Sequence, residues 1–94
     1  MTEDERDDLI VRDIRAMAIA RQDVPSLLRH VQQSLGQKDC KLLSAIYFHR
    51  AFGSDIPSIS PVAGWHGFGG ELSDAQVNEW VSPVLEEFRR VTKR

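Results

Sequence analysis

Hydrophobic side chains recur every three or four residues along most of the chain, which is the spacing of one face of an α-helix. The first such segment begins at Thr2, which has the capping-box spacing to Glu5, and ends near Arg21. The second lies between Asp23, an expected N-cap, and Gly36, an expected left-handed C-terminal residue. These local signals predict two amphipathic helices.

The third hydrophobic segment, residues 40–52, differs from the others. Asp39 is its expected N-cap and Gly53 its expected end. Large apolar residues occupy almost every direction around its axis: Leu42, Leu43, Ala45, Ile46, Tyr47, Phe48, Ala51 and Phe52. A helix that is hydrophobic all round is typically buried all round. We therefore expect this helix to lie at the centre, with the others packed against it.

Glycines and prolines interrupt residues 54–72 and exclude a long helix there. Three apolar residues could anchor one short helical turn to the core: Ile56, Ile59 and Val62. No segment alternates with a period of two, so no sheet is predicted.

A second capping box, Ser73 with Gln76, predicts the start of the last helix. Its apolar stripe runs from Val77 to Val91 and keeps its phase across Pro83, with Trp80 widening it. This favours one helix kinked at Pro83, and two separate helices are the alternative. The expected fold is all-α: a compact bundle of four or five helices around the buried helix 40–52, in a single domain covering residues 1–94.

The overall composition is that of an ordinary globular protein, with 94 residues, 41% hydrophobic residues and a formal net charge of −2. One cysteine excludes an internal disulfide framework and fits a reducing compartment. The acidic residues 1–10 do not have the pattern of a secretory signal, and no apolar run is long enough for a membrane span. A cytoplasmic protein without membrane contact is therefore expected.

The charges are unevenly distributed along the chain. Five acidic residues and one arginine occupy positions 3–8, whereas the four basic residues of the last six positions are Arg89, Arg90, Lys93 and Arg94. This distribution complements helix dipoles, and one end could also steer association with a charged partner.

The segment from Trp65 to Gly70 places two aromatic residues and a histidine on a glycine-rich connection. Trp65 and Phe68 could close one end of the core or could be presented as anchors for a protein partner, with His66 beside them. The glycines lack the lysine and the spacing of a phosphate-binding loop.

His49 and Arg50 are the polar exceptions in the expected central helix. A buried arginine needs a partner, which could be Asp55 or Asp74, while His49 could bind a backbone carbonyl. Alternatively, the pair lines a recess used by a ligand or partner.

The sequence offers little for catalysis or metal binding. The three histidines are separated by 19 and 17 residues, without the spacing of a zinc site. Cys40 follows an expected N-cap, but a lone cysteine at the start of a buried helix is typically inert. We predict no metal, no cofactor and no enzymatic activity.

The leading hypothesis is a small non-enzymatic cytosolic protein that binds another protein. The predicted contacts are Trp65, His66, Phe68, His49 and Arg50. Small size, slight acidity and missing catalytic motifs are also seen in bacterial immunity and inhibitor proteins, an analogy of class that rests on no shared motif. An adaptor role is equally compatible.

Three alternatives remain open. Residues 24–52 could form a helix-turn-helix in a nucleic-acid-associated regulator, although the net charge and the few polar residues of the second helix argue against it. The second alternative is a small metal- or cysteine-dependent enzyme. The stripe from Val77 to Val91 could also serve a homodimer.

Overall fold

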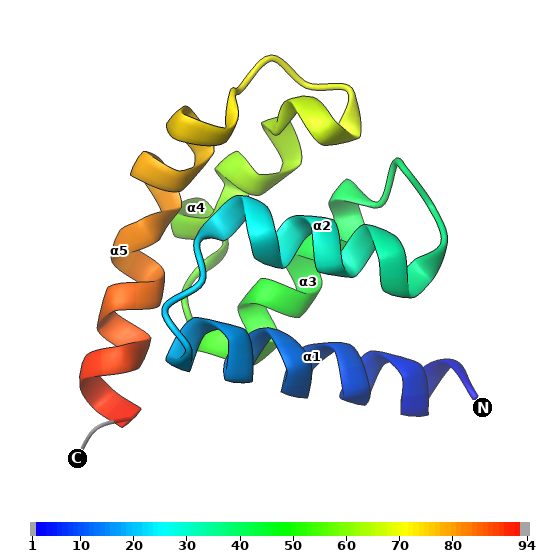
Figure 1. Ribbon diagram of the computed structural model, residues 1–94, viewed down its shortest axis with the longest axis horizontal. Coiled ribbons are helices and arrows are strands. Elements are labelled where there is room, and N and C mark those ends of the chain that lie inside the picture. The colour runs from blue at the N-terminus through cyan, green and yellow to red at the C-terminus, as the bar shows by residue number, and fades with distance from the viewer. Residues whose placement is uncertain (1, 93–94) are drawn as a thin grey trace.

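The computed structural model describes residues 2–92, and within this range it is all-α, as predicted. The helices are α1 (Glu3–Ile19), α2 (Val24–Leu35), α3 (Lys41–Phe52), α4 (Ile56–Ile59) and α5 (Asp74–Thr92), and two 3-10 turns, η1 (Ser60–Gly64) and η2 (His66–Phe68), lie between α4 and α5. In Figure 1, α1 runs along the bottom, α2 lies in front of α3, and α5 closes the left side.

The predicted capping signals fix the starts of three helices. The Thr2 hydroxyl accepts a hydrogen bond from the Glu5 amide at 3.2 Å, and the Asp23 carboxylate caps α2 in the same way. At α5, the Ser73 hydroxyl accepts from the Gln76 amide at 3.1 Å, and the Gln76 side chain accepts from the Ser73 amide at 3.0 Å. Each bond satisfies an amide that lacks a partner within its helix.

The start of α3 differs from the prediction. Cys40, not Asp39, occupies the N-cap position, and its side chain makes no capping hydrogen bond. The end of α3 was predicted correctly: Gly53 adopts the left-handed conformation with φ of 66°, and Gly36 ends α2 in the same way.

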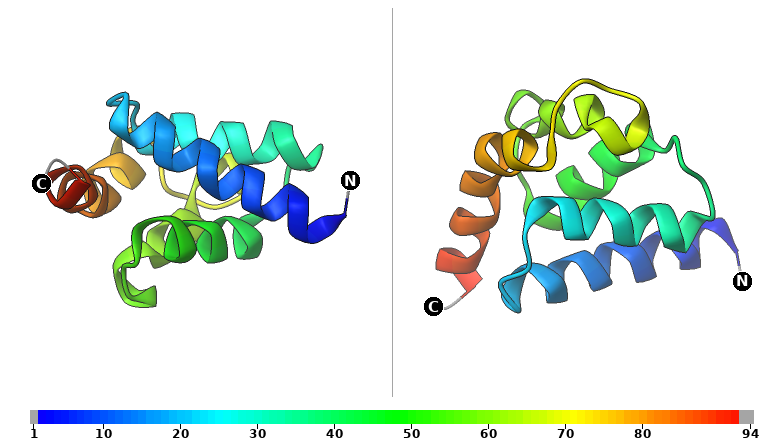
Figure 2. Two further views of the ribbon diagram at one scale, coloured as in Figure 1. Left: turned by 90° about the horizontal axis from the view of Figure 1, so that it is seen from below. Right: turned by 45° about the horizontal axis from the view of Figure 1, so that its top comes forward.

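The expectation that α3 is buried on all sides is wrong. Its buried residues are Ser44, Tyr47, Phe48 and Ala51, whereas 75% of Leu42 and 45% of Ile46 are exposed. The main neighbours of α3 are α1, α4, η1 and α5. In the left view of Figure 2, α3 lies at the edge of the molecule with α1 above it. A chain of this length has too few helices to surround one completely, so part of the apolar surface stays in water.

The buried residues form one hydrophobic cluster to which all five helices and both turns contribute. α4, η1 and η2 provide one buried residue each: Ile59, Val62 and Phe68. α5 passes through Pro83 as one continuous helix, which excludes the alternative of two separate helices. Val77, Val81 and Val84 are buried within the chain's own core. This part of the stripe is therefore not available to a partner helix.

No helix within residues 2–92 combines the length and the apolar character needed to cross a membrane.

The uneven burial of α3 predicts a contrast between two variants. Because Leu42 is exposed and glutamine has a similar helix propensity, Leu42→Gln should change the free energy of unfolding by less than about 0.5 kcal/mol. Phe48→Ala, which empties a fully buried position, should lower it by about 3–5 kcal/mol. Urea denaturation measures the free energy of unfolding of both variants. If Leu42→Gln lowered it as much as Phe48→Ala does, α3 would be enclosed after all.

Candidate functional site

The structure places Trp65 and Phe68 inside the molecule. Only 1% of Trp65 is exposed, and its ring contacts that of Phe68 edge to face with 5.0 Å between the centroids. The backbone folds back on itself here: the His66 amide donates to the Leu72 carbonyl at 2.7 Å, and the Leu72 amide donates to the Gly64 carbonyl at 2.8 Å. Trp65 and Phe68 are core residues, and they lack the exposure that the predicted anchor role requires.

The glycines of this segment allow it to wrap closely around Trp65. A Cβ atom added at Gly67 would lie 2.4 Å from the Trp65 ring, and one added at Gly70 would lie 2.2 Å from the Gly64 carbonyl oxygen. Both distances are far below van der Waals contact. The glycine-rich composition thus serves close packing around a buried indole rather than presentation of an aromatic side chain.

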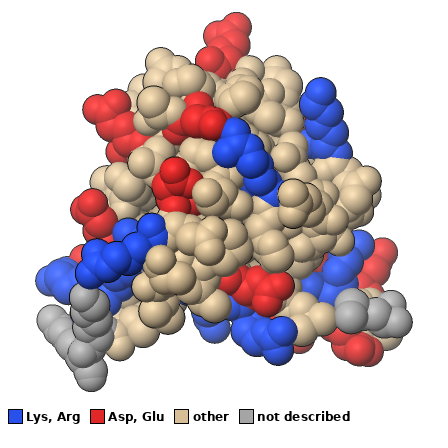
Figure 3. All heavy atoms as spheres, in the orientation of Figure 1, with Lys and Arg blue, Asp and Glu red and all other residues tan. Residues whose placement is uncertain are grey.

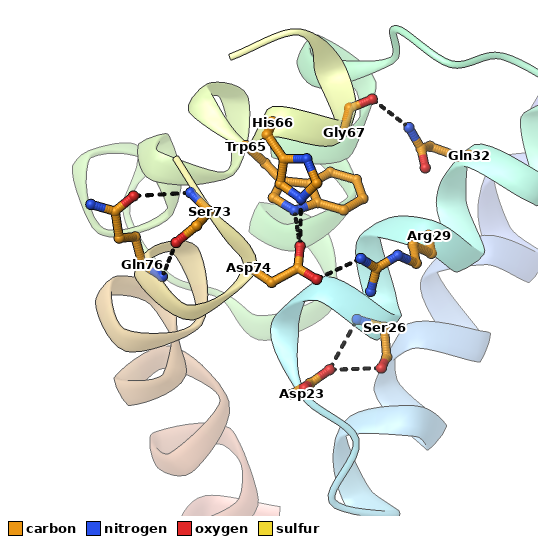
Figure 4. Close-up of polar contacts among 10 residues, drawn as sticks. All are labelled: Asp23, Ser26, Arg29, Gln32, Trp65, His66, Gly67, Ser73, Asp74 and Gln76. Atoms are coloured by element: carbon orange, nitrogen blue, oxygen red, sulfur yellow. Dashed lines mark hydrogen bonds and ion pairs between the residues drawn. The ribbon is translucent and has the colours of Figure 1, made fainter. Parts of the chain in front are cut away.

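The carboxylate of Asp74, the first residue of α5, organises the polar groups around Trp65 (Figure 4). One of its oxygens accepts hydrogen bonds from the Trp65 indole nitrogen at 2.7 Å and from His66 Nε2 at 2.8 Å. The other accepts from the Arg29 guanidinium at 2.5 Å. Asp74 therefore joins α2, α5 and the 65–68 segment.

These contacts stabilise the negative charge on Asp74. The hydrogen bond from Arg29, followed by those from Trp65 and His66, holds the pKa of this carboxyl well below its ordinary value of 3.8. The Arg29 guanidinium also lies over the Trp65 ring, 5.3 Å from its centroid, in a cation–π arrangement. From the same helix, the Gln32 amide donates to the Gly67 carbonyl at 2.8 Å.

A groove of about 370 Å³ lies beside this network, between α2 and the segment from Trp65 to Gly67. Its polar groups come from Arg29, three glutamines, Lys38 and His66. None of the described residues that line it is a serine, threonine or cysteine, so the His66–Asp74 pair has no hydroxyl or thiol to activate there. The groove suits hydrogen bonding to a polar surface better than covalent chemistry.

His49 and Arg50 lie on α3 and interact with other segments than Trp65 and His66 do. Arg50 is exposed and pairs with Asp8 of α1 at 2.6 Å, so neither Asp55 nor Asp74 is its partner. The predicted carbonyl contact of His49 is confirmed, since Nδ1 lies 2.7 Å from the Ser54 carbonyl oxygen. The five predicted site residues therefore do not form one site.

Two features of the surface escaped sequence reasoning. From the sequence, Asp74 was considered as a possible partner of Arg50, whereas in the structure it is the centre of the polar network around Trp65. Trp80 was predicted to widen the apolar stripe of α5, and 55% of it is exposed. Its position three residues after Val77 and one before Val81 places it at the edge of the stripe, where periodicity does not decide burial.

The residues considered for catalysis show no assembled centre within residues 2–92. No group of three or more histidine, cysteine, aspartate or glutamate side chains in that range is arranged to hold a metal ion. Burial raises the pKa of the Cys40 thiol, which disfavours the reactive thiolate.

Comparisons with protein-family models, with curated proteins and with solved structures give no match for this chain.

The close packing around Trp65 predicts different costs for two glycine substitutions. Gly70→Ala should lower the free energy of unfolding by about 1–3 kcal/mol, because the new methyl group collides with backbone. At Gly64 the nearest atom is the end of the flexible Leu72 side chain at 3.2 Å, so Gly64→Ala should cost less than about 1 kcal/mol. Thermal unfolding of the two variants compares them, and equal losses would contradict this packing.

The lowered pKa of Asp74 predicts a contribution to stability that depends on pH. The folded protein binds fewer protons at this site than the unfolded chain, so the contribution is complete above the ordinary value of 3.8 and is lost as pH falls below it. Between pH 6 and pH 3, wild type should therefore lose more free energy of unfolding than Asp74→Asn does. Parallel curves for the two proteins would contradict this assignment.

Asp74→Ala tests the hydrogen bonds rather than the charge. It leaves the buried Trp65 indole nitrogen without its acceptor, at a cost of about 1–3 kcal/mol at neutral pH. Asp74→Asn keeps an acceptor and should be the milder variant at that pH.

Proposed function

We propose that this chain is a small non-enzymatic cytosolic protein that acts by binding another protein, as an inhibitor, an immunity-like protein or an adaptor. The observation that supports this proposal most strongly is Trp80. A tryptophan that is more than half exposed on a well-packed helix leaves a large apolar surface in water, and tryptophan is the residue type most enriched at binding hot spots.

The surroundings of Trp80 fit such a contact. The side chain borders a groove of about 300 Å³ whose other lining residues are Ser54, Ser58, Pro83, Val84 and Glu87. The groove therefore lies between α5 and the start of α4, two elements that pack against each other. A rigid aromatic side chain beside a shallow groove with polar edges can bury apolar area at little cost in conformational entropy.

The other readings have less support. The outward residues of α3 include Leu42 and Ile46, whereas a DNA-reading helix exposes polar side chains to the bases. An enzyme would need a nucleophile or metal centre, and Cys40 is buried with a raised pKa. The contacts predicted for His66, His49 and Arg50 stay predictions, since all three are exposed.

Trp80→Ala tests the proposal directly. The tagged chain is used to capture proteins from extracts of the cells that produce it, and the captured protein is then titrated against the variants. Trp80→Ala should weaken this binding by at least about 2 kcal/mol, or roughly thirtyfold, and should change the free energy of unfolding by less than about 0.5 kcal/mol.

The matched control is Leu42→Ala, which removes another exposed apolar side chain from a different helix. It should leave binding unchanged. Full binding by Trp80→Ala, or an equal loss in both variants, would contradict a specific Trp80 contact.

A further inference from the structure

A second surface, which shares no lining residue with the Trp80 groove, concentrates positive charge around an exposed isoleucine. Three adjoining hollows of about 490, 130 and 370 Å³ share the side chains that separate them. Ile19 lines the first and second, and Arg21 and Arg89 line the second and third. We call this region the arginine surface, and its basic residues are Arg12, Arg15, Arg21, Arg50, Arg89 and Arg90.

The charge of this surface is opposite to that of the whole chain. It holds six of the twelve lysines and arginines, whereas among residues 2–92 two acidic residues, Asp8 and Glu86, line the same hollows and two more, Asp13 and Glu87, pair with its arginines. In Figure 3, basic side chains gather at the lower left, where α5 ends, and along the lower edge beneath α1. The arginine surface thus carries more basic than acidic side chains, although the net charge of the chain is −2.

Two of these arginines have a clear structural role. The Arg15 guanidinium donates to the Ala51 and Arg50 carbonyls at the end of α3, at 2.9 and 3.1 Å. Arg89 donates to the Ala18 carbonyl at 2.5 Å and to the Gln22 carbonyl at 2.9 Å, just where α1 ends. Arg15 satisfies carbonyls in the last turn of α3, whereas Arg89 adds a second hydrogen bond at the Ala18 carbonyl, which also accepts from the Arg21 amide.

The other four arginines of this surface do not serve to bind carbonyls at helix ends. Arg12 lies 3.7 Å from Asp13 with 72% of its side chain exposed, and Arg21 is also exposed. Arg50 and Arg90 each pair with one carboxylate, Asp8 and Glu87 respectively, at the surface. Exposed pairs of this kind contribute little to stability, so helix capping does not explain why these arginines gather here.

The apolar part of the surface indicates the kind of partner. Ile19, which is 54% exposed, lies where the first two hollows meet, and Val11 and Ala16 line the first hollow beside it. A nucleic-acid backbone would leave this aliphatic centre unused. An amphipathic protein segment that carries both carboxylates and an apolar side chain matches the arginines and the aliphatic centre together.

We propose that the arginine surface binds an acidic amphipathic segment of a partner protein. Carboxylates of this segment pair with Arg12 and Arg21, and an apolar side chain packs on Ile19. The inference rests on the proposed protein-binding function and adds the chemistry of the partner. The arginine surface is separate from the Trp80 groove, so an experiment can contradict one of the two proposals while the other holds.

The test uses the full chain and a defined probe, a synthetic helical peptide with glutamates on one face and leucines on the other. Titration of the ¹⁵N-labelled protein should shift amide signals around Arg12, Ile19, Arg21 and Arg50. The double variant Arg12→Gln/Arg21→Gln should weaken binding roughly fivefold, as expected for the loss of two exposed ion pairs. Ile19→Ala should weaken it roughly tenfold.

The matched control, Lys38→Gln/Lys41→Gln, removes the same positive charge from outside the arginine surface and should bind the peptide as wild type does. Trp80→Ala should also bind it normally, which separates this proposal from the previous one. Poly-L-glutamate, which offers charge without an apolar face, should bind more weakly than the peptide. Three results would overturn the inference: no saturable shift, equal weakening in the lysine control, or tighter binding of a DNA duplex than of the peptide.

Discussion

The arrangement of this protein depends on the burial of one indole ring. Trp65 is enclosed by the core, and its nitrogen would carry an unsatisfied hydrogen bond there unless an acceptor reached it. Asp74 supplies that acceptor, and Arg29 balances the charge of the carboxylate. Because these residues belong to the 65–68 segment, α5 and α2, a single polar network positions three parts of the chain. Gly67 and Gly70 make the close approach sterically possible.

The two tryptophans therefore lie in opposite environments, and the proposed function rests on the exposed one. Trp65 holds the structure together, whereas Trp80 remains on the surface beside a groove. An exposed indole leaves apolar surface in water, and in the proposed function a partner covers it. The proposal of a protein-binding role consequently moves from the glycine-rich connection, where the sequence placed it, to α5.

Hydrogen bonds at the ends of two helices also determine where some of the arginines lie. Arg15 and Arg89 satisfy the carbonyls at the ends of α3 and α1, and this brings positive charge to one side of the molecule. Further arginines extend the same side around Ile19 well beyond what capping requires. The small net charge of the chain thus conceals an uneven distribution of charge, which supports the proposal that an acidic segment binds beside Ile19.

The sequence by itself determined the helical class, most helix boundaries and the two capping boxes, because these depend on side chains within four residues of one another. It placed Ile59 and Val62 correctly in the core, but the same expectation for Ile56 is wrong, since 53% of that residue is exposed. Only the tertiary structure decided which side of α3 is covered, which tryptophan is buried and that Asp74 meets Arg29. These outcomes depend on contacts between residues distant in the chain, and an apolar side chain at the edge of a helical stripe is equally compatible with core and surface.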